Sequence, residues 1–190
     1  MSALLLDEKI LAVGDVLSRA RIPHAFGGAL ALAYYATPRA TIDIDLNVFL
    51  PTTEAERVLA ALTPLGVAPP SREERGSLVE RGQVRLLWEQ TPIDLFFAYD
   101  PLHDCCMERT RRAPFGDGQT IPVLSAEDLA IFKTIFDRVK DWRDLRELLF
   151  ALAGDFDAEY ALGWLRRILT ADDQRLRRFE TLLRSDDSGS

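Results

Sequence analysis

The sequence has few lysines and few cysteines, and its net charge is negative. Lys9, Lys133 and Lys140 are its only lysines, and all its other basic residues are arginines. A formal net charge of −7 does not favour general nucleic-acid binding, which usually relies on Lys and Arg to neutralise phosphates, so a nucleic-acid partner would need a local basic patch. The two cysteines, Cys105 and Cys106, are adjacent, and a disulfide between them would be strained. This pair therefore indicates a reducing compartment.

The sequence also has no long hydrophobic run. Its N-terminal leucines are followed directly by Asp7, Glu8 and Lys9, a pattern that fits neither a signal peptide nor a membrane-spanning segment. We therefore expect a cytoplasmic protein with no membrane partner. What is present is an ordinary globular composition, because 47% of the 190 residues are hydrophobic and 28% are charged. This length is sufficient for one domain or two small lobes.

The first part of the chain is predicted to be a mixed α/β sheet, since short strands alternate with helices there. The expected helices are Leu4–Arg19, Ala29–Ala36 and a helix after Pro51 with Thr53 at its start, and the expected strands are His24–Phe26, 41–48, Leu78–Trp88 and Ile93–Tyr99. Residues 64–71 and 101–120 are expected to form loops, with a turn at Gly116–Gly118.

Beyond Pro122 the sequence becomes helical in character. Ser125 with Asp128 predicts the start of a helix that runs to about Val139. Further helical periodicities cover 145–153, 160–169 and 176–183. We therefore predict three segments, namely an N-terminal α/β lobe over residues 1–121, a C-terminal helical lobe over 122–184, and a flexible polar tail over 185–190.

Hydrophobic and polar residues alternate along the strand at 41–48. One face carries Ile42, Ile44, Leu46 and Val48, and the other carries Thr41, Asp43, Asp45 and Asn47. Because successive side chains of a strand point to opposite faces, both carboxylates lie on the same polar face and could hold a metal ion. Alternatively, the segment is a half-exposed edge strand whose acids prevent pairing with other chains.

Three further features favour nucleotide chemistry. Gly27 and Gly28 would allow the backbone to approach a phosphate closely, and Asp43 and Asp45 would supply carboxylates for Mg²⁺ or Mn²⁺. Asp94 lies within an otherwise hydrophobic strand, where an unpaired carboxylate is costly to bury. It is therefore either a third metal ligand or an acid that is satisfied by an arginine.

The order of these features resembles the DNA polymerase β-like nucleotidyltransferases: a glycine pair, a helix, the pattern Arg-x-Thr-x-Asp-x-Asp, and a later strand with another aspartate. In particular, the chain resembles the AbiEii/MenT-type nucleotidyltransferase toxins in two segments, GGALALAYYATPRATIDIDLNV and LSAEDLAIFKTIFDRVKDWRDLREL. The second segment matches the toxins' helix lysine and Lys/Arg-Asp-x-x-Asp-Leu pattern at Lys133, Lys140, Asp141, Asp144 and Leu145. The resemblance covers roughly residues 20 to 150.

This resemblance implies an α/β nucleotidyltransferase lobe with a C-terminal helical lobe, and a Mg²⁺-dependent toxin of a toxin–antitoxin system. The reaction would transfer a nucleoside monophosphate from an NTP, with a pyrimidine such as CTP favoured, to the 3′ acceptor end of tRNA and so block aminoacylation and translation. The expected partners are the tRNA acceptor stem, the NTP and a cognate antitoxin, which is kinase-like in some relatives.

The resemblance also implies roles for individual residues. The expected catalytic residues are Asp43, Asp45 and Lys133 with Asp141 or Asp144; the expected nucleotide contacts are Gly27, Gly28, Arg39 and Lys133; and the expected metal ligands are Asp43, Asp45 and Asp94. Lys133 could instead form a simple helical ion pair with Asp137. Thr41 is a candidate regulatory phosphorylation site, since a phosphate there would repel both metal and triphosphate.

Two other functions remain open. Nucleotidylation of a protein or of a small molecule would use the same catalytic residues, and a catalytically inactive nucleotidyltransferase fold could act as a binding module. The sequence does not determine which NTP or which tRNAs are used, or the oligomeric state.

Overall fold

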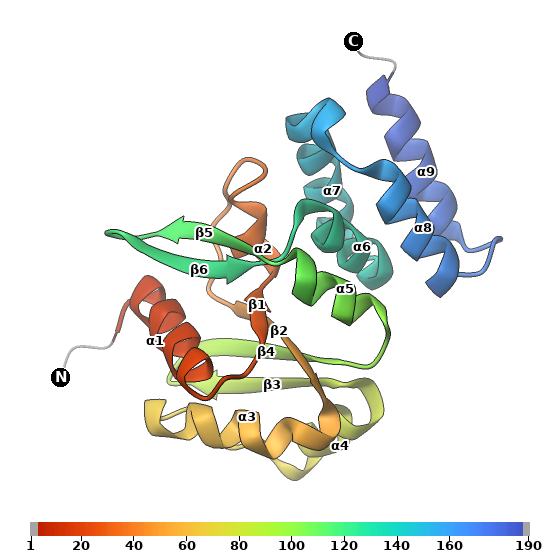
Figure 1. The fold of residues 1–190 in the computed structure, drawn as a ribbon. Coiled ribbons are helices and arrows are strands. Elements are labelled where there is room, and N and C mark those ends of the chain that lie inside the picture. Colours follow the sequence, from red (N-terminus) through yellow and green to blue (C-terminus); the bar gives the residue numbers. More distant parts are fainter. Residues whose placement is uncertain (1–3, 188–190) are drawn as a thin grey trace. The chain divides into compact units, whose positions relative to one another are not determined.

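The computed structural model describes residues 4–187. These residues form two compact units that are discontinuous in sequence (Figure 1). The first unit comprises the chain up to Leu30 together with Ala40–Leu124, and the second comprises Ala31–Arg39 together with the chain from Ser125 onward.

The first unit is built on a six-stranded sheet with the order β3-β4-β2-β1-β6-β5. The strands are β1 (His24–Phe26), β2 (Ile44–Pro51), β3 (Gln83–Trp88), β4 (Thr91–Ala98), β5 (Arg111–Phe115) and β6 (Gln119–Val123). The sheet is mixed, because β2 pairs with β4 and β1 with β6 in parallel, whereas the other neighbours are antiparallel. The predicted mixed α/β class is confirmed.

Four helices belong wholly to the first unit: α1 (Leu6–Arg19), α3 (Ala55–Leu62), α4 (Arg72–Arg81) and α5 (Leu102–Arg109). Helix α1 places Val13 and Leu17, which are four residues apart, on one buried face, and it contacts α3 and β6. Helix α4 contacts β3 (Figure 1). The short helix α2 (Gly28–Leu32) starts within the first unit, and two 3₁₀ turns flank α3 at Thr52–Glu54 and Thr63–Leu65.

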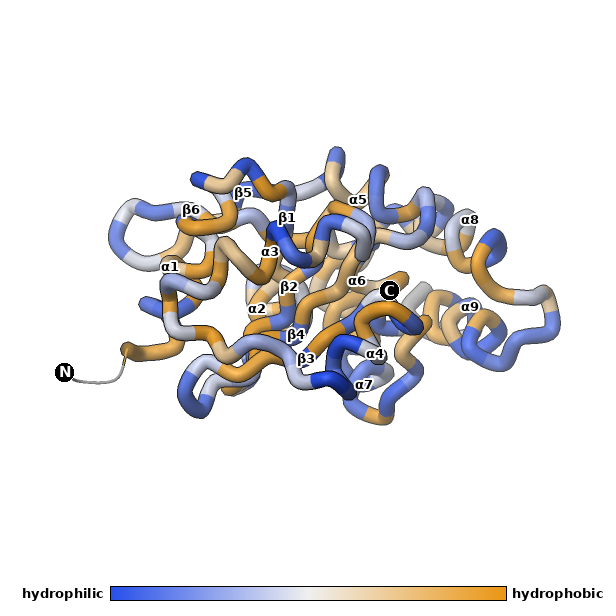
Figure 2. Tube along the Cα trace, turned by 90° about the horizontal axis from the view of Figure 1, so that it is seen from below, coloured by the Kyte–Doolittle hydropathy of each residue, from blue (hydrophilic) through white to orange (hydrophobic). Residues whose placement is uncertain are grey.

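The second unit is helical, with α6 (Ala126–Phe136), α7 (Val139–Leu152), α8 (Ala158–Ile168) and α9 (Gln174–Asp187). Helix α6 contacts the other three. It begins as predicted, because the Ser125 hydroxyl accepts a hydrogen bond from the Asp128 backbone N–H at 3.2 Å. Hydrophilic and hydrophobic residues alternate along α9 (Figure 2), whose Phe179 is fully buried. This amphipathic pattern explains how short, charged helices form a packed unit.

Several predicted segments differ from the structure; for example, β4 begins at Thr91 instead of Ile93, and α6 ends at Phe136 instead of near Val139. Residues 78–82 were assigned to a strand, but Ser71 and Glu74 form a capping box that starts α4, and left-handed Gly82 ends it. Strand β3 therefore begins only at Gln83. The predicted loop at 101–120 contains α5 and the β5–β6 hairpin, whose turn includes the predicted glycines Gly116 and Gly118 at positive φ.

The region around the two acids also differs in detail. Helix α2 ends at Leu32 rather than at Ala36, and strand β2 begins at Ile44. Ile42 consequently lies outside the core with 72% of its surface exposed. Helix α3 starts at Ala55, after the 3₁₀ turn that contains Thr53, so Thr53 is not its first residue as predicted.

The predicted tail at 185–190 overlaps the end of α9, and residues 188–190 lie outside the described part of the chain. Within residues 4–187, no helix combines the length and the hydrophobicity needed to cross a bilayer.

Candidate active site

Three acidic residues of the first unit, Asp43, Asp45 and Asp94, lie close together at neighbouring strands of the sheet. In the parallel pair of β2 and β4, Asp45 is directly opposite Asp94. Asp43 lies just before β2, and its Oδ2 is 3.7 Å from Arg85 Nη2, so it belongs to the same group of charges. On the other flank of β4, antiparallel β3 places Arg85 opposite Asp94. Adjacent strands therefore bring three acids and one arginine together, which we call the acidic face.

Arg85 forms the closest ion pair of this face. Its Nε lies 2.7 Å from Asp94 Oδ1 and its Nη2 lies 2.6 Å from Asp94 Oδ2, a bidentate arrangement. The same Nη2 lies 3.7 Å from Asp43 Oδ2. The hydrogen bonds to Asp94 raise the pKa of Arg85 further above its ordinary value, so the guanidinium stays charged. The structure thus supplies the arginine that one of the two interpretations of Asp94 required.

The glycine pair is needed to accommodate the side chains of β2. Gly28 has φ +55°, and a Cβ built on it would lie 1.7 Å from Asp45 Oδ2. A Cβ on Gly27 would lie 2.7 Å from Asn47 Nδ2. The backbone N–H of Gly27 also donates to the carbonyl oxygen of Asp45 at 2.9 Å. Both glycines therefore let the start of α2 approach the acidic strand closely, and Asp45 occupies the space that any other side chain at position 28 would fill.

The donor set of the acidic face fits one hard divalent cation. Mg²⁺ is usually held by one or two carboxylates, and water and substrate phosphates complete its coordination. Asp43 and Asp45 meet this requirement with oxygen ligands alone. Among the described residues, no group of three or more His, Cys, Asp and Glu side chains is arranged to hold a metal. The predicted role of Asp94 as a metal ligand stays a prediction.

The second unit contains a buried charge cluster that joins α6, α7 and the segment before β2. Lys133 Nζ lies 2.6 Å from Asp144 Oδ2, and Arg39 binds the same carboxylate through Nε at 3.3 Å and Nη2 at 3.2 Å. The side chains of Lys133 and Asp144 are almost completely buried. Burial raises the pKa of Asp144, but the hydrogen bonds and charges of Lys133 and Arg39 outweigh this effect and hold the pKa below its ordinary value.

Asp141 and Asp144 occupy different positions in this cluster. Asp141 accepts a hydrogen bond from the Arg138 backbone N–H at 3.2 Å and one from Arg138 Nε at 2.6 Å, so it caps the start of α7. It lies 3.7 Å from Lys133 Nζ, farther than Asp144 does. Asp137, the alternative partner considered for Lys133, accepts from Trp142 Nε1 instead. The catalytic and nucleotide-binding roles of these residues stay predictions.

Thr41 is tied to the backbone just before β2. Its hydroxyl accepts a hydrogen bond from the Asp43 N–H at 3.2 Å and lies 3.4 Å from the Asp43 carbonyl oxygen. The side chain is partly exposed. Thr41 therefore helps to set the backbone conformation that presents Asp43.

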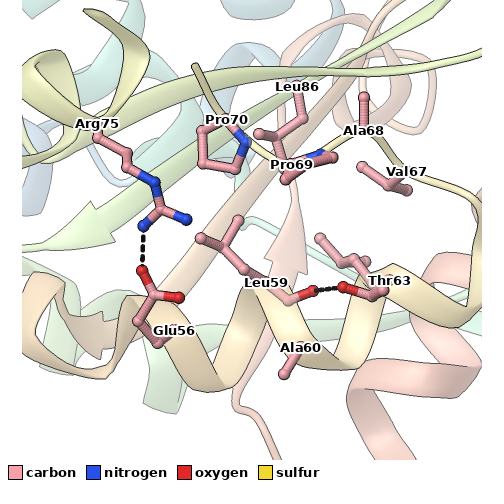
Figure 3. Close-up of a pocket in the computed structure, with 11 residues that line it drawn as sticks. Glu56, Leu59, Ala60, Thr63, Val67, Ala68, Pro69, Pro70, Arg75 and Leu86 are labelled. Carbon is pink, nitrogen blue, oxygen red and sulfur yellow. Dashed lines mark hydrogen bonds and ion pairs between the residues drawn. The ribbon is translucent and has the colours of Figure 1, made fainter. Parts of the chain in front are cut away.

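A separate pocket of about 220 Å³ lies on the other face of the sheet (Figure 3). It is lined by side chains of α3 and by Val67, Pro69 and Pro70, and Leu86 of β3 contributes from the sheet. Leu86 alternates with Arg85 along β3, so the pocket and the acidic face are on opposite sides. Arg75 and Glu56 form an ion pair at one end of the pocket. This mainly hydrophobic pocket does not include the acids of β2 and β4.

Comparison with solved structures identifies the fold. Neither a protein-family model nor a curated protein sequence matches this chain. The antibiotic-resistance enzyme ANT(2″)-Ia, solved with adenylyl-2″-tobramycin, superposes with a TM-score of 0.57 at 14% identity and covers 96% of this chain and 97% of its own. The lincosamide antibiotic adenylyltransferase LnuA, solved with lincomycin, has a TM-score of 0.53 at 12% identity and covers 77% of this chain and 98% of its own.

A nucleotidyltransferase-like protein from Paracoccidioides brasiliensis is similar over 91% of this chain and 92% of its own, with a TM-score of 0.51 and 16% identity. The chain therefore has the polymerase β-like nucleotidyltransferase fold, as predicted. At these identities the likeness defines the fold alone.

Sequence reasoning missed Arg85 as a residue of the site. Its position was nevertheless accessible, because Trp88 and Thr91 pair across a turn at Glu89 and Gln90. A two-residue hairpin connection fixes the register of both strands, and counting back from it places Arg85 opposite Asp94. The prediction started the second strand at Ile93 instead of Thr91, so the connection was taken as four residues long and the register was misplaced.

Replacing Gly28 with alanine should destabilise the first unit by at least about 2 kcal/mol, because a Cβ would collide with Asp45 and left-handed backbone is unfavourable for alanine. Urea unfolding measures the change. Gly76→Ala is the matched control, since a Cβ at this α4 position meets nothing within 4 Å and alanine favours a helix. Equal stabilities of the two variants would contradict the role of Gly28.

Asp144→Asn should reduce the free energy of unfolding at pH 7 by about 3 kcal/mol, because it leaves the buried Lys133 ammonium without its closest counter-charge. Urea unfolding compares this variant with Asp15→Asn, which removes an exposed ion pair with Arg19 and should change stability by less than about 1 kcal/mol. Similar losses in both variants would show that the cluster contributes little.

The stability contributed by Asp144 should depend on pH. Its pKa is lower in the folded state than in the unfolded chain, so the contribution is present above the ordinary value of about 4 and is lost as pH falls through the folded pKa. Repeating the unfolding comparison between pH 7 and pH 2.5 should show the difference between wild type and Asp144→Asn shrinking only below about pH 4. A constant difference would contradict the lowered pKa.

Proposed function

We propose that this protein is a Mg²⁺-dependent nucleotidyltransferase that transfers a nucleoside monophosphate from an NTP to an acceptor hydroxyl. The observation that carries this proposal is the close contact between the Asp45 carboxylate and Gly28. Asp43 lies nearby, and the protein has the nucleotidyltransferase fold. The Asp45 carboxylate leaves room only for glycine at position 28. Such a glycine is expected where a backbone turn and a metal-binding strand must lie close together.

In this proposal Asp43 and Asp45 bind and orient one divalent cation, and Gly27 and Gly28 keep the approach to the triphosphate free of side chains. When bound, the cation neutralises phosphate charge and activates the α-phosphorus. The acceptor oxygen forms a new bond to the α-phosphorus as the bond from that phosphorus to the α–β bridging oxygen breaks. Pyrophosphate leaves with the bridging oxygen, and the hydroxyl proton passes to the solvent. In this proposal the acidic face therefore binds the positive charge that neutralises the triphosphate.

Arg39, Lys133 and Asp141 or Asp144 enter the proposal through the resemblance to the nucleotidyltransferase toxins. Lys133 and Arg39 would contact phosphate, and one of the two acids would position Lys133 or the acceptor hydroxyl. Since Lys133 Nζ lies 2.6 Å from Asp144, a phosphate contact requires Lys133 to share or exchange this partner. Of the two acids, Asp144 is better placed to act on Lys133, because Asp141 is engaged in capping α7.

For the acceptor we propose the 3′ end of tRNA, so that the protein acts as a toxin by blocking aminoacylation in the cytoplasm. This choice rests on the segments 39–45 and 133–145, which resemble the toxins. A cognate antitoxin would then be its partner. The arginines of the second unit are partly used internally, since Arg175 pairs with Asp173 and Arg178 lies over Trp142. A tRNA contact would therefore depend on a limited patch.

A small-molecule hydroxyl is the second candidate acceptor. The similarity to ANT(2″)-Ia extends over nearly the full length of both chains, and that enzyme was solved with an adenylylated aminoglycoside. An exposed hydroxyl on an antibiotic would use the same carboxylates and the same chemistry.

A labelling assay distinguishes the acceptors. The protein is incubated with Mg²⁺ and each α-labelled NTP in turn, with total tRNA, an aminoglycoside and lincosamide panel, or no acceptor. We expect label at the 3′ end of tRNA, and a loss of about 100-fold or more in Asp45→Asn, because a catalytic cation contributes several kcal/mol. Asp15→Asn, which changes an exposed acid of α1 that pairs with Arg19, should retain activity.

Label in an antibiotic but not in tRNA would select the second candidate. Label in the protein alone would indicate protein nucleotidylation. A growth defect that persists in Asp43→Ala, without label anywhere, would indicate a binding module instead of an enzyme.

We also propose that Thr41 is a regulatory phosphorylation site. Its hydroxyl holds the Asp43 backbone, so a phosphate there would both break this contact and add negative charge beside a metal ligand. Co-expression with a kinase-like antitoxin should add one phosphate at Thr41, detected by intact mass and peptide mapping, and Thr41→Ala should resist silencing. Silencing of the wild type with Thr41 unmodified would rule this out.

A further inference from the structure

The acidic face already contains a cation, the guanidinium of Arg85. Its two bonds to Asp94 use both carboxylate oxygens, and its Nη2 also lies 3.7 Å from Asp43. The three carboxylates and this guanidinium together leave a formal charge of −2, which matches one divalent cation. Without Arg85 the charge would be −3, and a second divalent cation would find a free carboxylate at Asp94.

We propose that Arg85 limits the acidic face to a single divalent cation by acting as the permanent counter-charge of Asp94. The inference rests on the proposed function, in which Asp43 and Asp45 hold the cation. It assigns Asp94 a different role from the third metal ligand that its place in the sequence suggests. Asp94 holds Arg85, and Arg85 keeps a second ion away.

The geometry of the Arg85–Asp94 pair opposes the binding of a second cation at Asp94. A second cation at Asp94 would have to displace two charge-assisted hydrogen bonds of 2.6 and 2.7 Å from a planar donor that matches the carboxylate. It would also approach the positive charge that Arg85 places beside Asp43. Lysine, with a compact single ammonium, could not satisfy both oxygens in this way.

The backbone holds Arg85 in this position. The β3–β4 hairpin pairs Arg85 with Asp94 directly, so the side chains face each other across neighbouring strands. Arg85 is 60% exposed and Asp94 is 18% exposed, so Arg85 covers the acid from the solvent side. A substitution at Arg85 removes this cover without leaving a cavity in the core, and the vacated acid becomes accessible to ions.

Titration with Mn²⁺, with free Mn²⁺ measured by electron paramagnetic resonance, counts the bound cations directly and without any activity. Wild type should bind one Mn²⁺ and Arg85→Gln two. The double variant Arg85→Gln/Asp94→Asn should return to one, because the second ion needs the Asp94 carboxylate. Arg19→Gln is the matched control, since it removes the same charge from an exposed ion pair with Asp15 and should still bind one.

Thermal unfolding supplies a second readout and shows that each variant is folded. In EDTA, Arg85→Gln should melt below the wild type, because three carboxylates then repel one another. Added Mn²⁺ should raise its melting temperature by more than it raises that of the wild type or of Arg19→Gln.

The outcomes separate the inference from the proposed function. One bound ion in both wild type and Arg85→Gln, lost in Asp45→Asn, would overturn the inference and leave the proposed function intact. Two ions in the wild type would also overturn the inference. No bound ion in either protein would overturn both, whereas an increase from one to two that depends on Asp94 supports both.

Discussion

The close approach of Gly28 to the Asp45 carboxylate is the constraint on which the arrangement of the first unit depends. It fixes the start of α2 against β2. The parallel pairing of β2 with β4 places Asp45 beside Asp94, and the two-residue turn between β3 and β4 places Arg85 opposite Asp94. Backbone sterics at Gly28 therefore decide where Asp45 can lie among these charges.

The two units handle their acids in different ways. In the first, Asp94 is 18% exposed and is paired with Arg85, whose side chain is 60% exposed. In the second, Asp144 is buried with Lys133, and the same carboxylate also accepts hydrogen bonds from Arg39. The first pair is therefore reached by water, whereas the second is a buried pair whose charges stabilise each other.

The sequence predicted those features that depend on residues close together in the chain. The cap at Ser125 and the mixed α/β class follow from short-range patterns, and both are present in the structure. The alternation predicted over 41–48 holds only from Ile44 onward, since Ile42 is exposed. Helix α4 was missed because its residues are mostly charged and lack a hydrophobic face, although its capping box was readable. The contact between Arg39 and Asp144 spans 105 residues and depends on tertiary packing, so no local pattern could reveal it.

The assignment of Ala31–Arg39 to the second unit means that the chain passes from one unit to the other three times. No single cut can separate the units, and a fragment that ends at Leu124 would contain Arg39 without Asp144. During synthesis on the ribosome, Arg39 must likewise remain without this partner until α7 has emerged. The helical unit is therefore completed late, by a peptide that was made early.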